Sequence, residues 1–304
     1  MLLSDSPLAF TARGAGRYNA WALLRPQVLS VPVQTTLARV VELAGVGLHT
    51  GEPCCLRLLP AEAGRGVLFR LNGAEIPARS RWAAPARRCT ALARGRARVC
   101  TVEHLLAALY ALDVDNVIAE VEGPEVPAGD GSALPFVRLL QQGGRRRQAL
   151  PRPLASLDGP VWVARGPACL VALPSRGLRI TVGVHYPGTP VGSQHLSLRV
   201  GPAAFASEIA PARTVAFAHE AAGLQAAGLG LGGNPGNVLV IGSHDYASPP
   251  RWPDEVARHK LLDLLGDLSL VGHRFGAHIV GIRPGHALNR AIARLLSARL
   301  EGSS

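Results

Sequence analysis

The sequence predicts an α+β fold built from two halves of similar make-up. Three observations support this prediction. Residues 34–150 show strand patterns, then a helix, a further strand and a second helix, and residues 151–304 repeat this succession. A stretch rich in turn-forming residues at 142–157 separates the two halves. A length of 304 residues exceeds the usual size of one domain, so we expect two domains, at 34–150 and 151–304.

In the first half, strand-forming residues bounded by glycine and proline predict strands at 37–43, 54–59 and 67–71. A helix is expected from about Thr101, followed by a strand at 117–122 and a second helix at 132–142. The boundary stretch at 142–157 contains two adjacent glycines and two prolines, which favour turns.

In the second half, the same patterns predict strands and then two helices that flank one more strand. The expected strands are at 161–164, 169–173, 179–185 and 277–282, and the expected helices are at 254–270 and 286–300. A glycine-rich stretch at 223–237 predicts a flexible turn around an inserted lobe.

Residues 1–33 form an N-terminal extension without a periodic pattern. They contain three arginines and a single acid, and they lack the compact apolar segment of a secretory signal. A disordered extension, a start codon placed too early and an organellar transit peptide all stay open. We expect a cytoplasmic protein, or an organellar one if residues 1–33 are a transit peptide.

The composition limits the kinds of partner that the chain can bind. No stretch approaches the roughly 18 uncharged apolar residues of a membrane-spanning helix, so only transient contact with a membrane surface stays open. Five cysteines without CxxC spacing argue against a disulfide framework and indicate a reducing compartment. The net charge is +11, but the arginines are scattered and no nucleic-acid motif accompanies them, so we expect an anionic small-molecule substrate and no nucleic acid.

The helix at 254–270 carries the sharpest local signal. His259, Asp263 and Asp267 follow at intervals of four residues and therefore share one helical face. A histidine and a carboxylate one turn apart can bind one divalent cation, although a solvated, salt-bridging face fits the same spacing. Lys260, the only lysine of the chain, lies beside them; either a site needs its compact ammonium group or it survives a codon bias by chance.

Two further segments carry polar residues that suit catalysis. Glu103 and His104 begin an otherwise apolar helix; His104 fits a third metal ligand, and Glu103 fits either a general base or a residue that complements the helix dipole. His286 follows a strand pattern at the junction of a loop and a helix, where either proton transfer or helix capping fits an imidazole. A carboxylate such as Asp267 nearby would favour its charged form.

Several motifs in one order resemble the UDP-3-O-acyl-N-acetylglucosamine deacetylase family. They are the segment GVGLHTG at 45–51, TVEH at 101–104 and the run that follows it to 116, PEVPAGDGSALPF at 124–136, Ala212-Arg213-Thr214, the glycine-rich turn at 228–233, and the run from Arg258 to His286. Separate motifs in the same order are far more specific than any single one, and they cover nearly all of the chain after Val33.

The resemblance implies a role for each candidate residue. It implies a zinc ion held by His104, His259 and Asp263, with Glu103 as the general base. It also implies that His286, oriented by Asp267, protonates the leaving amine. Three more residues complete the implied site, with Thr214 stabilising the oxyanion, Lys260 contacting the substrate phosphate and Phe217 contacting the substrate near Val215, where the family usually has phenylalanine.

The same resemblance implies the fold and the reaction. Each domain would be a mainly antiparallel sheet layered on helices, with the active site between the domains and an acyl passage in the inserted lobe of 151–304. The implied reaction removes the N-acetyl group of UDP-3-O-(3-hydroxyacyl)-N-acetylglucosamine, the committed step of lipid A synthesis, and we expect a monomer. A binding protein and a metal hydrolase of another nucleotide-sugar are the competing functions; retention of all six candidate residues of the metal and proton-transfer sites argues against an inactive relative.

Overall fold

The computed structural model describes residues 32–301. The expected extension at 1–33 lies outside them except for its last two residues. The described chain contains helices and mainly antiparallel sheets, which confirms the predicted α+β class. No described helix is long and apolar enough to cross a membrane.

The first sheet has five strands in the order β2-β3-β9-β4-β5. All neighbours are antiparallel except β4 and β9, which run parallel. The strands are β2 (Val41–Val46), β3 (Pro53–Pro60), β4 (Val67–Leu71), β5 (Ala74–Pro77) and β9 (Val117–Glu122). Strand β9 has the bounds that the sequence predicts.

The second sheet repeats this topology in the order β12-β13-β18-β14-β15, with β14 and β18 parallel and the short β11 beside β18. In β14 every second residue is buried, which is the alternation expected when one face covers a core. The strands are β11 (Leu154–Ser156), β12 (Val161–Arg165), β13 (Ala168–Pro174), β14 (Leu178–Tyr186), β15 (Gly192–Arg199) and β18 (Arg274–Ile282). In each five-strand order, the last strand along the chain (β9 or β18) therefore lies beside the third (β4 or β14).

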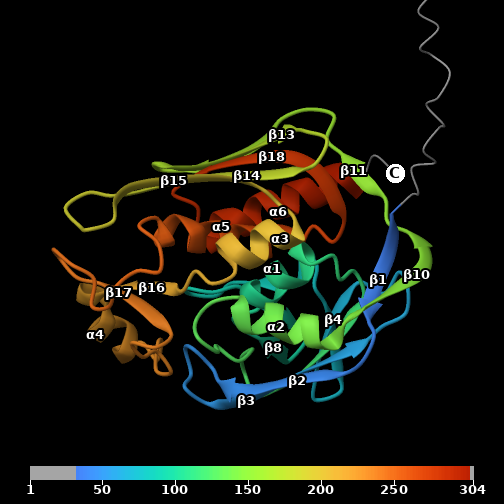
Figure 1. The fold of residues 1–304 in the computed structure, drawn as a ribbon, viewed down its shortest axis with the longest axis horizontal. Coiled ribbons are helices and arrows are strands. Elements are labelled where there is room, and N and C mark those ends of the chain that lie inside the picture. The colour runs from blue at the N-terminus through green and yellow to red at the C-terminus, as the bar shows by residue number, and fades with distance from the viewer. Residues whose placement is uncertain (1–31, 302–304) are drawn as a thin grey trace, which may run out of the picture. The chain divides into compact units, whose positions relative to one another are not determined.

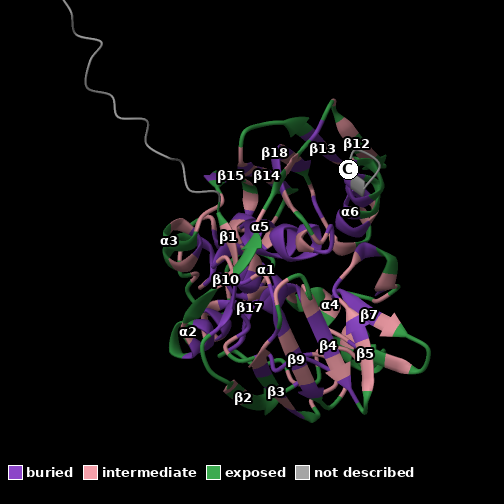
Figure 2. Cartoon of the chain, turned by 90° about the vertical axis from the view of Figure 1, so that its right-hand side faces the viewer, coloured by how far each residue is buried: buried purple, intermediate pink, exposed green. Residues whose placement is uncertain are grey.

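Helices lie between the two sheets (Figure 1). The central pair, α1 (Glu103–Ala111) and α5 (Glu255–Ser269), contact each other and are buried on nearly all sides (Figure 2). A polar side chain buried in such a helix needs a hydrogen-bond, ionic or metal partner, so the buried polar residues of this pair indicate a specific role. The outer helices are α2 (Leu134–Gly143) and α6 (His286–Glu301).

Smaller elements join these layers. Strands β6 (Ala83–Ala84), β7 (Ala91–Arg94) and β8 (Ala97–Val99) precede α1 and form a three-stranded sheet. A parallel pair precedes α5, formed by β16 (Thr214–Phe217) and β17 (Val238–Ile241) and connected through α4 (Ala218–Ala226). The remaining short helices are η1 (Ser80–Trp82), α3 (Pro202–Ala204) and η2 (Phe205–Ile209).

Two predictions about the first half are wrong. The strand expected at 37–43 is interrupted, because β1 (Val33–Leu37) pairs with β10 (Arg145–Pro151) whereas β2 pairs with β3. Between them, the amide of Ala38 donates to the carbonyls of Gly143 and Gly144 at the end of α2. The stretch at 142–157, expected to be turns, contains β10 and β11, so its prolines lie at strand ends.

Candidate active site

The structure brings His104, His259 and Asp263 into one buried cluster between α1 and α5. The Nε2 atom of His104 lies 3.5 Å from Asp263 Oδ1, and the Nε2 atom of His259 lies 3.4 Å from the same oxygen. One nitrogen or oxygen atom of each residue lies within 4.8 Å of the others. His104 and His259, which are 155 positions apart in the sequence, thus both direct a ring nitrogen toward Asp263 Oδ1.

A glycine permits this close approach of the two helices. A Cβ atom at Gly266 of α5 would lie 2.1 Å from the carbonyl oxygen of Glu103, at the start of α1. Any larger residue would therefore push α5 away from the end of α1 that carries Glu103 and His104.

The donor set of this cluster fits a metal ion. Asp263 Oδ1 is buried and has no hydrogen-bond partner among the described residues. The Nδ1 atom of His259 lies 3.2 Å from the Ala212 carbonyl oxygen, so Nε2 is left to face the cluster. Two atoms each about 2.1 Å from a tetrahedral zinc ion lie about 3.4 Å apart, which is the spacing observed here.

The protonation states of these groups also suit a metal ligand set. Burial lowers the pKa of His259 to about 3, so its imidazole is neutral and has a free lone pair. Burial opposes ionisation of Asp263, but the cationic side chains of Lys260 and His286 outweigh it and hold the pKa of this carboxyl well below its usual range. Lys260 donates to Asp263 Oδ2 at 2.9 Å.

Glu103 lies beside the cluster at the first position of α1. It is 2% exposed, and its Oε2 atom accepts a hydrogen bond of 2.9 Å from the backbone amide of Thr90. Burial raises the pKa of Glu103, which moves this carboxylate toward the range of an effective general base. Its Oε1 atom lies 3.8 Å from Nε2 of His286.

His286 begins α6 and faces the cluster from the other side. Its Nδ1 atom donates to Asp267 Oδ2 at 2.9 Å, and its Nε2 atom lies 3.9 Å from Asp263 Oδ2. Burial alone would lower the pKa of His286, but Asp267 and Asp263 outweigh it and raise the pKa to about 9. The imidazole is therefore a cation at neutral pH, with one N–H directed at the cluster.

Two residues near Asp267 have no role in the sequence prediction. Asn289 Nδ2 donates to Asp267 Oδ2 at 2.9 Å, and the Thr90 hydroxyl donates to Asp267 Oδ1. Asn289 lies three residues after His286 on one helical face, a spacing that could have revealed it. Thr90 precedes a short strand and gives no sequence signal, although it contacts both Glu103 and Asp267.

The segment GVGLHTG at 45–51 is anchored by Glu125. This carboxylate is 1% exposed and accepts hydrogen bonds from the amides of His49 and Thr50, each 2.9 Å long. The Thr101 hydroxyl donates to its other oxygen at 2.6 Å. Thr101 has a φ of +57°, an unfavourable value for a β-branched residue, just before α1 turns toward the cluster.

An ion pair holds the Ala212-Arg213-Thr214 run against α5. Arg213 donates to both oxygens of Glu255, at 2.9 and 3.1 Å, and both residues are buried. This pair fixes the Ala212 carbonyl beside His259. It also places Thr214, whose hydroxyl donates to the Gly131 carbonyl at 2.9 Å.

A cavity of about 430 Å³ opens onto the cluster. Its walls come from both halves and include Glu103, His104, Thr214, His259, Lys260, Asp263 and His286. Leucine and valine side chains line another part of it, among them Leu224, Leu229 and Val215. Phe217 is not among its lining residues, since its ring packs against Tyr186 with centroids 5.0 Å apart.

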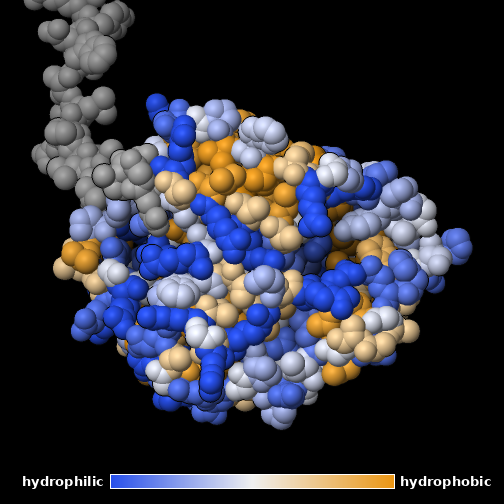
Figure 3. Space-filling model, turned by 180° about the vertical axis from the view of Figure 1, so that it is seen from behind, coloured by the Kyte–Doolittle hydropathy of each residue, from blue (hydrophilic) through white to orange (hydrophobic). Residues whose placement is uncertain are grey.

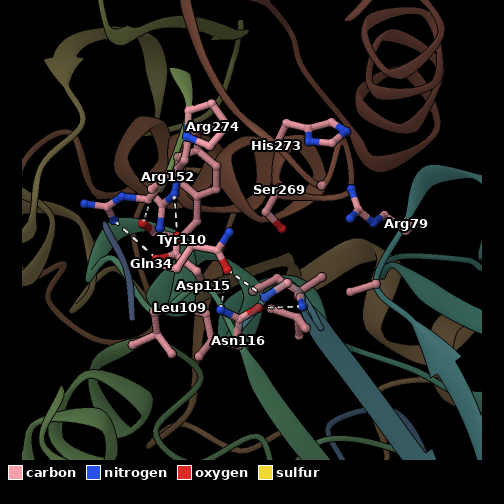
Figure 4. Close-up of a pocket in the computed structure, with 18 residues that line it drawn as sticks. Gln34, Arg79, Leu109, Tyr110, Asp115, Asn116, Arg152, Ser269, His273 and Arg274 are labelled. Carbon is pink, nitrogen blue, oxygen red and sulfur yellow. Dashed lines mark hydrogen bonds and ion pairs between the residues drawn. The ribbon is translucent and has the colours of Figure 1, made fainter. Parts of the chain in front are cut away.

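A second cavity of about 250 Å³ lies at the far end of α1 (Figure 4). Three of its charged side chains pair with one another: Arg152 lies 3.6 Å from Asp115, and Arg274 lies 3.4 Å from Asp115 and over the Tyr110 ring. It contains none of the predicted site residues. We therefore assign these charges to an ion-pair network that joins strands and helix.

The class of protein that fits the first cavity is a hydrolase. Candidate metal ligands, a buried carboxylate and a carboxylate-bound imidazole converge there on a space large enough for a substrate.

The family model of UDP-3-O-acyl N-acetylglycosamine deacetylase matches residues 34–298, and the chain belongs to this family. A protein of Syntrophotalea carbinolica named UDP-3-O-acyl-N-acetylglucosamine deacetylase is 39% identical over 274 residues, covering 88% of this chain and 89% of that protein. A protein of the same name from Thermosynechococcus vestitus is 42% identical, covering 90% of this chain and 96% of its own. One from Chlamydia muridarum is 40% identical, covering 88% and 96%.

Proposed function

We propose that this protein hydrolyses the N-acetyl group of UDP-3-O-(3-hydroxyacyl)-N-acetylglucosamine, giving acetate and the free amine, the committed step of lipid A synthesis. The observation that carries the proposal is the convergence of His104, His259 and Asp263 with Glu103 in one buried cavity. Membership of the deacetylase family and the names of the relatives support this choice of substrate.

We propose zinc as the metal, held by His104, His259 and Asp263. Two imidazoles and one carboxylate leave a fourth coordination position open, as catalytic zinc sites do. When bound, the ion would polarise the amide carbonyl and acidify a water molecule. The orphaned oxygen of Asp263 supports its role as a ligand.

Glu103 and His286 divide the proton transfers in this mechanism. In its ionised form Glu103 takes a proton from the attacking water, while the Thr90 amide holds the carboxylate in place. His286, kept cationic by Asp267, gives its Nε2 proton to the amine as the C–N bond breaks. Asp267 acts as a positioning residue because it fixes the ring through Nδ1.

The cavity offers groups for the rest of the substrate. Thr214 would stabilise the oxyanion after its hydroxyl turns away from the Gly131 carbonyl. Lys260 and Arg88 line the same space and suit a diphosphate, and Leu224 and Leu229 of the lobe around α4 suit an acyl chain. Phe217 would reach the substrate only through a movement of its ring away from Tyr186.

The proposal also covers the organisation of the protein. We expect domains at 34–150 and 151–304 and a monomer in the cytoplasm; the five cysteines, all free, accord with a reducing compartment.

Release of acetate from the synthetic UDP-linked substrate tests the proposal. The full chain loaded with zinc should release acetate, and Glu103→Gln should lower the rate at least about a hundredfold. Glu62→Gln, at an exposed position outside the cavity, is the matched control and should keep the wild-type rate. Folded, metal-loaded protein that deacetylates another nucleotide-sugar and not this one would favour the competing hydrolase.

A further inference from the structure

The two sheets differ sharply in the faces that they turn away from the helices. A row of alternating charges crosses the first sheet, from Glu42 through Arg57, Glu120 and Arg70 to Glu75. Successive partners lie 2.9 to 3.5 Å apart. Such a face is solvated and gives a partner protein or lipid little to bind.

The matching row across the second sheet begins with apolar side chains. Trp162 lies opposite Val171, and Val171 lies opposite Val280. Leu173 and Ile282 share this face; Trp162 is 67%, Ile282 44% and Leu173 38% exposed. We call Trp162, Val171, Leu173, Val280 and Ile282 the apolar patch. Clustered exposed apolar side chains on one face of a sheet mark an interaction site rather than a solvated surface.

The sequence around the apolar patch is strongly basic. Residues 161–199 and 274–283, which form the main strands of the second sheet and their turns, contain no acidic residue and six arginines, of which Arg274 pairs with Asp115 in the second cavity and the other five remain. Residues 41–77 and 117–122 of the first sheet contain three arginines and six acidic residues. Apolar side chains gather in the upper part of the molecule seen from behind, on the side of the second sheet, with hydrophilic side chains around them (Figure 3).

Charge decides which partner fits this face. A second copy would bring the same basic face, and residues 1–33, with three arginines and one acid, are basic as well. Both would be repelled, whereas the phosphates of an anionic bilayer attract arginines while apolar side chains enter the headgroup region.

We propose that the outer face of the second sheet, with the apolar patch and its surrounding arginines, docks on the surface of an anionic phospholipid bilayer. Tryptophan is the side chain best suited to the boundary between headgroups and acyl chains, and Trp162 is the most exposed large apolar residue of those described.

The position of this face has a consequence for the cavity. Arg165 and Ala168, at the hairpin between β12 and β13, and Arg283, just after β18, line the cavity that holds Glu103. A bilayer against the second sheet would therefore lie near the rim of that cavity. If the proposed function holds, an acylated substrate can enter without its chain crossing open water; the docking itself does not depend on that function.

Vesicle flotation with the full chain and no substrate tests the docking. We expect binding to vesicles that contain phosphatidylglycerol, weaker binding to pure phosphatidylcholine, and loss of binding at high salt. The double substitution Trp162→Ser and Ile282→Thr should lower the partition coefficient at least about tenfold. Arg179→Gln and Arg199→Gln should each lower it roughly fivefold.

Matched variants on other surfaces serve as controls. Val46→Thr, at a 42% exposed position of the first sheet, and Arg146→Gln, on β10, should bind vesicles like the wild type. All variants should keep the wild-type thermal midpoint and deacetylate a water-soluble, short-acyl substrate normally, which separates this test from that of the proposed function.

Two outcomes would overturn the proposal. One is the absence of vesicle binding, or binding that the double substitution leaves unchanged in folded protein. The other is a concentration-dependent dimer in sedimentation experiments that Trp162→Ser dissociates, because the apolar patch would then be a contact between two copies.

Discussion

Helices α1 and α5 occupy the same place in the two halves, yet they present their polar residues differently. Helix α1 carries Glu103 and His104 in its first turn and is apolar beyond it. Helix α5 carries His259, Asp263 and Asp267 as a stripe through its interior. The stripe supplies a rigid set of ligands and a carboxylate, and the helix end supplies the base, so neither half has a complete site.

Breaking the stripe on α5 should have the largest effect. Asp263→Ala removes a candidate ligand and the partner of Lys260. We expect the rate of deacetylation to fall by roughly a thousandfold or more, because a bound metal stabilises the transition state by several kcal/mol. Asp254→Ala, at the cap of the same helix and outside the cavity, should keep most activity. Equal loss in both variants would mean that α5 is simply unfolding.

Removing the base or the acid should cost about 10² to 10⁴ in rate while the metal stays bound. Glu103 is needed ionised, so activity should fall as the pH drops through its raised pKa. His286 is needed protonated, so activity should fall as the pH rises through about 9.

The pH profiles of the variants assign each limb to one residue. Glu103→Ala should flatten the acidic limb and His286→Ala the alkaline one, with the exposed His195→Ala as a control that changes neither. Because the two groups interact, the apparent values belong to the site as a whole. Near-normal turnover by Glu103→Ala with metal in place would require another base.

Separating the helices without touching their polar residues sharpens the comparison. Gly266→Ala places a methyl group against the start of α1, so we expect the free energy of unfolding to fall by about 1–3 kcal/mol or more. Gly223→Ala in α4, where a Cβ meets no atom within 4 Å, should be neutral or stabilising in the same urea titration. Equal stability of the two variants would show that α1 and α5 are not closely packed.

The row of alternating charges on the first sheet should affect stability least. Arg70→Ala removes contacts with Glu75 and Glu120 at a partly exposed position, so the free energy of unfolding should change by less than about 1 kcal/mol per pair. If urea unfolding shows that the free energy of unfolding falls by several kcal/mol, the row of alternating charges stabilises the fold and is not simply a solvated face.

Elements with a clear apolar pattern were predictable from the sequence, and elements rich in polar residues, glycine or proline were not. The bounds of β9 match the prediction, and those of α5 differ by one residue at each end. Strand β15 was missed because its outward side chains are polar and its glycine and serines resemble a loop. Strands β10 and β11 were missed because their prolines suggest turns, although strand ends accept proline.

The candidate site shows the same limit. Spacing alone could place His259, Asp263 and Asp267 on one face, because a helix has a fixed period. It could not bring His104 to them, since that contact depends on Gly266 and the packing of two distant helices. Thr90 and Glu125 act through backbone amides and a loop, which leave no pattern in the sequence.

The central claim is that both halves build one metal site, and the zinc content of two variants tests it most directly. Wild-type protein should carry about one zinc ion per chain, while His104→Ala on α1 and His259→Ala on α5 should each fall well below this after dialysis, with folding intact. Zinc retained at the wild-type level in His104→Ala but lost from His259→Ala would contradict the claim, because the second half alone would then hold the metal.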